Sequence, residues 1–75
     1  MHAKIVEIVA KELNVAANTL TPATKLRDLS TDELDLNNVF MAFEDHFEFE
    51  WTTDDAEAIV TLQDIESYLQ RNGKI

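Results

Sequence analysis

The chain has 75 residues and a mass of 8.6 kDa, so it can form only one small domain, because a second hydrophobic core would not fit. It contains no cysteine, which excludes a disulfide framework, a thiolate metal site and a thiol nucleophile. Six basic and 15 acidic residues give a net charge of −9, and such a chain is repelled by phosphate backbones and anionic lipid. We therefore expect no nucleic-acid or membrane partner, and we expect partners that carry basic patches.

Two further features of the composition concern fold class and location. One glycine and one proline beside 45% hydrophobic residues argue against a disordered or linker-like chain and leave few turns for a many-stranded sheet. No apolar run approaches the roughly 18 residues of a membrane span, and charges interrupt the N-terminal apolar residues. The sequence favours a cytoplasmic helical domain.

Apolar spacing predicts a first helix over residues 2–15, followed by a long loop. The apolar positions, three and four residues apart, are Ile5, Val6, Ile8, Val9 and Leu13. Pro22 has no amide hydrogen for a helix, so residues 14–24 are expected to form an ordered loop. Leu20, Leu26 and Leu29 are the residues expected to anchor this loop to the core.

The second predicted helix begins between Ser30 and Asp32 and ends near Phe47. Its main apolar stripe consists of Leu36, Val39, Phe40, Phe43 and Phe47. Leu34 and Met41 lie seven residues apart on another flank. Such a helix is either central to a bundle or presents an apolar patch to a partner.

Two helices are predicted in the C-terminal third. Residues 53–55 open a short helical turn through residues 56–60, with acids suited to the positive end of its dipole. Thr61 and Asp64 have the spacing of a capping box for a last helix, which runs to Arg71, with Gly73 just beyond it. Its predicted buried face is Leu62, Ile65, Tyr68 and Leu69. The expected architecture is all-α: a single domain over residues 1–75, with three main helices, one short helix and a long first loop.

Acidic residues are concentrated in the middle of the chain. Between Asp28 and Gln70 there are 13 acids and no Lys or Arg, and nine of these acids lie from Asp32 to Asp55. A charge run of this kind is commonly a solvated face. Here the acids flank the apolar pair Leu34 and Met41, which favours a docking surface for a basic partner.

The segment from Leu29 to Asp35, LSTDELD, followed by residues 41–47, MAFEDHF, resembles the acyl carrier protein family. That family has Leu-Gly-x-Asp-Ser-Leu-Asp and then Met-x-Leu-Glu-x-x-Phe at the same spacing. The resemblance continues through residues 54–59 and 61–65 to Tyr68-Leu69, about fifty aligned residues in all. It implies a small helical bundle of fatty acid or polyketide-type biosynthesis that docks on carrier-dependent enzymes and is not itself an enzyme.

The chain departs from the family at the position that carries the chemistry. Members attach 4′-phosphopantetheine to the serine of Asp-Ser-Leu, and here that position is Glu33. A carboxylate cannot form the serine phosphodiester, so no cofactor is expected. Neither Ser30 nor Ser67 has the sequence context that the resemblance implies for the modifying transferase.

Three hypotheses account for Glu33. It can complete a capping box with Ser30 at the start of the second helix. It can imitate the charge of the phosphodiester, so that partners dock as on a loaded carrier. It can also be an engineered Ser→Glu change in a genuine carrier.

Other departures concern partner choice and the core. Asn37 and Asn38 replace the Val-Glu pair that the family has on its partner-facing side, which suggests altered partner choice. Phe40, Phe43 and Trp51 are larger than their counterparts in the family. They fit either a repacked core or a partly filled acyl cavity.

Enzyme and metal chemistry find no support in the sequence. His2 and His46 have no partner at a metal-ligand spacing, and the acidic run lacks the glycine and spacing of a calcium loop. No catalytic residue and no metal site is predicted.

The leading hypothesis is a monomeric docking module without a prosthetic group. The docking residues transferred from the family are Asp32, Leu34, Asp35, Met41, Glu44 and Asp45, with Glu33 at the former attachment point. The rivals are a genuine carrier with an engineered residue 33 and a structural or regulatory scaffold. The scaffold would make contact through an apolar patch around Leu36.

Overall fold

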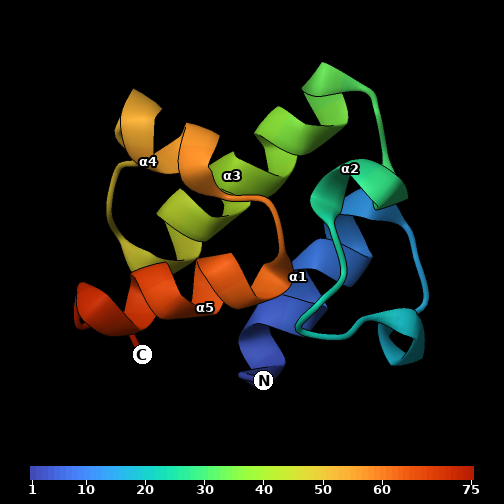
Figure 1. Cartoon of the computed structure of the whole chain (residues 1–75), viewed down its shortest axis with the longest axis horizontal. Coiled ribbons are helices and arrows are strands. Elements are labelled where there is room, and N and C mark those ends of the chain that lie inside the picture. Colours follow the sequence, from blue (N-terminus) through green and yellow to red (C-terminus); the bar gives the residue numbers. More distant parts are fainter.

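The computed structural model describes all 75 residues, and every regular element in it is helical (Figure 1). The three long helices are α1 (Ala3–Leu13), α3 (Glu33–Phe47) and α5 (Leu62–Arg71). The short elements are the 3₁₀ turn η1 (Ala17–Thr19), α2 (Leu26–Leu29) and α4 (Thr53–Ala58). The prediction of an all-α bundle with a long first loop is confirmed. The predicted short helix is α4, and the structure adds a second short helix, α2, between the predicted loop and the start of α3.

The core lies where α1, α3 and α5 meet, since α1 packs against both of the other long helices. Its fully buried side chains include Ile5, Val9, Val39, Phe43 and Leu69. All four residues predicted for the inner face of α5 are buried. Helical spacing therefore identified the inward faces correctly.

The first loop is attached to the connector between α4 and α5 by main-chain hydrogen bonds. The Leu26 amide donates to the Val60 carbonyl at 3.0 Å, and the Leu62 amide donates to the Thr24 carbonyl at 3.0 Å. Leu26 is buried, while Leu20 and Leu29 are half-buried against the core, as predicted. This fixed loop positions α2 beside the start of α3 (Figure 1).

The start of α5 is stabilised by the capping box that the sequence predicts. The Thr61 hydroxyl accepts from the Asp64 amide, and Asp64 Oδ2 accepts from the amides of Thr61 and Val60 at 3.0 and 2.9 Å. The hydrogen bonds from Thr61 and Val60 hold the pKa of Asp64 below its ordinary value. At the other end of α5, Gly73 adopts a left-handed conformation with φ 69°.

Aromatic rings fill the space between α3 and α5. The Trp51 ring lies 4.5 Å from the Tyr68 ring and packs edge-on against Phe40 at 5.2 Å, measured between ring centroids. Burial and the nearby negative charge of Asp55 raise the pKa of the Tyr68 hydroxyl. These contacts place the connector between α3 and α4 against the core.

Candidate functional site

The outward face of α3 exposes two large apolar side chains in a line. Leu34 is 72% exposed and Met41 is 57% exposed. In a helix, residues 34, 38, 41 and 45 follow one another along one face, and Asn38 and Asp45 are exposed as well. We call these four residues the outward stripe. The structure thus brings together three of the predicted docking residues, namely Leu34, Met41 and Asp45.

The carboxylates of Asp32 and Asp35 have hydrogen-bond partners within the chain. Asp32 caps α3, with its Oδ1 accepting from the Leu34 amide at 2.9 Å. Asp35 is half-buried, and its Oδ2 accepts from the Ser30 hydroxyl at 3.1 Å. Both residues therefore organise the start of α3, in addition to contributing negative charge there.

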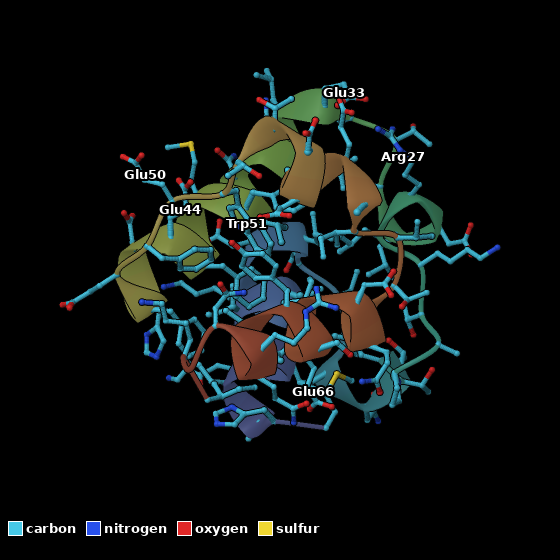
Figure 2. The ribbon with its side chains drawn as sticks, turned by 60° about the vertical axis from the view of Figure 1, so that its left-hand side comes forward. Arg27, Glu33, Glu44, Glu50, Trp51 and Glu66 are labelled. Atoms are coloured by element: carbon cyan, nitrogen blue, oxygen red, sulfur yellow. The ribbon has the colours of Figure 1, made fainter.

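Glu44 supports the connector that follows α3. Its Oε2 accepts from the Trp51 amide at 2.9 Å, and the Trp51 indole Nε1 donates to the Phe40 carbonyl at 3.1 Å (Figure 2). Glu44 is half-buried. This bond could not be predicted from local spacing, because residues 44 and 51 are brought together only by the turn after α3.

Glu33 forms an ion pair in place of the predicted capping box. Its Oε1 lies 3.0 Å from Nη1 of Arg27 on α2, and both side chains are about two-thirds exposed, at 68% and 67%. The predicted box is wrong because Asp32, directly before the helix, is the N-cap. Ser30 instead ends α2, and its hydroxyl accepts from the Asp32 amide at 3.2 Å. Sequence reasoning also missed Arg27, because no helical spacing relates it to residue 33.

A cavity of about 380 Å³ lies between α2, α3 and the end of α4. Its walls include Leu26, Leu36, Phe40 and Ile59, and Arg27 and Glu33 both border it. Phe43 and Trp51 do not line it, so only one of the three enlarged aromatic residues narrows this space.

Leu36 is only 5% exposed, and this corrects the proposed apolar patch around it. The residue lies three positions before Val39 and seven before Phe43, so it shares their inward face. The scaffold hypothesis therefore loses the surface on which it relied.

The two histidines lie outside the outward stripe of α3. His2 caps α1, with its Nδ1 accepting from the Lys4 amide at 3.2 Å, and its own amide donates to Glu66 Oε2 at 2.8 Å (Figure 2). His46 is exposed near the end of α3, edge-on to Phe47.

No group of three or more potential ligands is arranged to hold a metal ion. None of the helices has the length and apolarity needed to cross a membrane.

Comparison with known proteins gives a consistent result over nearly the whole chain. Residues 3–69 match the family described as "Phosphopantetheine attachment site". An acyl carrier protein of Bdellovibrio bacteriovorus is 36% identical over 75 residues, covering 99% of this chain and 96% of that protein. An acyl carrier protein of Syntrophobacter fumaroxidans is 42% identical over 73 residues, covering 96% and 90%. One from Syntrophus aciditrophicus is 37% identical over 71 residues, covering 93% and 89%.

Proposed function

Because the chain belongs to the phosphopantetheine-attachment family of acyl carrier proteins, we propose that it is a docking module that carries no prosthetic group. Acyl carrier proteins interact with biosynthetic enzymes and are not themselves enzymes. In this proposal the chain acts as a monomer in the cytoplasm and presents α3 to basic surfaces of carrier-dependent enzymes. The observation that carries the docking proposal is the outward stripe, where the exposed apolar side chains of Leu34 and Met41 lie in line with the exposed carboxylate of Asp45.

The residues around position 33 do not fit 4′-phosphopantetheine. Attachment needs a free hydroxyl at the start of α3, and Glu33 offers a carboxylate that is paired with Arg27. The Ser30 hydroxyl is half-buried and bonded on both sides, to Asp35 and to the Asp32 amide. Its position at the end of α2 also differs from that of a residue opening a long helix. These contacts support a chain that is not loaded.

Docking through α3 has a clear electrostatic expectation. The chain has a net charge of −9, and Asp45 is an exposed carboxylate in the outward stripe. Charge complementarity of this kind raises the association rate and is screened by salt. Affinity for a basic partner should therefore fall steeply as ionic strength rises, mainly through a slower association rate.

The proposal is tested by intact mass spectrometry after incubation with coenzyme A and a promiscuous phosphopantetheinyl transferase. The unsubstituted chain and Glu33→Ser are run side by side. We expect only Glu33→Ser to gain one phosphopantetheine, which would mean that the scaffold is still recognised and that residue 33 prevents loading. A gain by the unsubstituted chain, located by fragmentation to Ser30 or Thr31, would identify a working carrier with an unusual site.

A failure of both chains to gain mass would mean that residue 33 is not the only obstacle to loading. In that case the binding measurement decides, with the transferase immobilised and the unsubstituted chain in solution at low and high salt. Binding that is strong at low salt and weak at high salt supports docking without transfer. No binding at low salt would overturn the docking proposal.

A further inference from the structure

Arg27 and Glu33 form the only ion pair in the structure that joins two different helices. The other pair, Lys4 with Glu7, lies within α1. Arg27 extends from a fixed turn, because the neighbouring Leu26 is buried and its amide is bonded to the Val60 carbonyl. Figure 2 shows Arg27 and Glu33 together where α2 approaches the start of α3. The backbone of Arg27 is therefore fixed at a point from which the guanidinium reaches this carboxylate.

The surroundings make this cation unusual. No Lys or Arg occurs from Asp28 to Gln70, so Arg27 is the last base before the acidic part of the chain. Among the acids at the start of α3, Asp32 and Asp35 accept hydrogen bonds from uncharged groups, and only Glu33 is paired with a cation. Lys25 also borders the nearby cavity but forms no ion pair.

We propose that Arg27 is a selectivity residue of the docking face, which neutralises Glu33 within the chain and keeps partner cations away from position 33. A partner side chain that approaches Glu33 must displace the guanidinium or be repelled by it. A partner that fits this face therefore places its cations along the outward stripe, near Asp45, and a neutral group opposite position 33. The inference rests on the proposed docking function.

One consequence concerns the hypothesis that Glu33 imitates a phosphodiester. An anion that is already paired at 3.0 Å presents little net charge to a partner. The contact instead favours Glu33 as a link between α2 and α3. Removing Arg27 should expose the carboxylate and create the charge that the mimicry hypothesis requires.

The size of the effect follows from the exposure of the pair. Exposed ion pairs contribute about 0.2–1 kcal/mol, which corresponds to a factor of about 1.5 to 5 in affinity. Arg27→Gln should therefore strengthen binding of a basic partner by a factor of about 1.5 to 5 at low salt. Removing a positive charge also makes the net charge of the chain more negative, which by itself strengthens binding to a basic partner. This effect of net charge must be measured separately.

Lys25→Gln supplies the matched control, because it makes the same change in net charge two residues away at an unpaired cation. Binding to the immobilised transferase is measured for the unsubstituted chain, Arg27→Gln, Lys25→Gln, Glu33→Gln and the Arg27→Gln/Glu33→Gln double variant. Circular dichroism verifies that each variant is folded. We expect Arg27→Gln to increase affinity more than Lys25→Gln does. When Glu33 is already replaced by Gln, Arg27→Gln should increase affinity only as much as Lys25→Gln does.

The outcomes separate this inference from the proposed function. If all variants bind in a salt-dependent manner and Arg27→Gln equals Lys25→Gln, docking stands and the role of Arg27 is overturned. If no variant binds at low salt, the docking proposal fails and the role of Arg27 fails with it. If the excess effect of Arg27→Gln persists in the Glu33→Gln background, Arg27 acts on the partner directly and the pairing argument is wrong.

Discussion

Replacement of Glu44 distinguishes a structural role from a docking role at a position that the family resemblance assigns to docking. Glu44→Ala removes the acceptor of the Trp51 amide, a bond of 2.9 Å to a half-buried carboxylate. Hydrogen bonds to charged groups contribute about 1.5–3 kcal/mol, and partial exposure reduces this, so we expect a loss of about 1–2 kcal/mol. For a domain of this size that corresponds to a decrease in Tm of roughly 5–15 °C.

Two variants serve as controls in this experiment. Glu44→Gln keeps an oxygen acceptor without the charge and should lose about half as much stability as Glu44→Ala. Asp45→Ala removes the same charge from an exposed neighbour without a hydrogen bond, so its stability should change by less than about 0.5 kcal/mol. Thermal unfolding is followed by circular dichroism. The fluorescence of Trp51, the only tryptophan, reports on the connector itself.

Docking affinity completes the comparison. At a temperature where all variants are folded, Asp45→Ala should weaken transferase binding more than Glu44→Gln does, because only Asp45 lies in the outward stripe. The structural role of Glu44 is refuted if Glu44→Ala unfolds at the same temperature as the unsubstituted chain and loses as much affinity as Asp45→Ala. Glu44 would then act at the docking surface, and its bond to Trp51 would contribute nothing measurable.

Two further predictions concern the core and the pH dependence of stability. Leu36→Ala should lower the free energy of unfolding in urea by about 2–4 kcal/mol because the side chain is buried, whereas Leu34→Ala should lower it by less than about 0.5 kcal/mol. Equal losses would contradict the assignment of Leu36 to the inward face and Leu34 to the outward face. Asp64 has a lowered pKa, so its stabilising contribution is complete above the unfolded value of about 3.9 and is lost as pH falls through the lower folded value. Asp64→Asn should therefore flatten the loss of stability below about pH 4, as followed by urea unfolding at several pH values, and an unchanged slope would refute this assignment.

Local patterns were sufficient to predict the long helices and one of their caps. Ile5, Ile8 and Val9 repeat at helical spacing and are buried, and the pair Thr61 and Asp64 forms the predicted capping box. In each case the interacting residues lie within a few positions of one another. The information needed for the prediction is therefore contained in a short segment.

The errors occurred where two local interpretations competed or where distant segments decided the outcome. Ser30 and Asp32 are both good caps, and spacing alone does not determine which of them starts α3. Helix α2 is only four residues long and depends on burial of Leu26 and on its bond to Val60, which is distant in sequence. The Arg27–Glu33 pair follows from the same docking of the first loop, so it could not be predicted before that docking was known.

The fold explains how the start of α3 can accommodate a glutamate at residue 33, the position that the sequence resemblance aligns with the attachment serine. A carboxylate near a helix N-terminus is favoured by the helix dipole, and Arg27 pairs with it in the solvent-exposed region outside the core. The core residues Val39 and Phe43 are buried six and ten positions beyond residue 33. Under the proposed function, loss of the attachment hydroxyl would remove one chemical step and leave these core contacts and the outward stripe in place. Such a protein would retain the docking surface of a carrier while taking no acyl group.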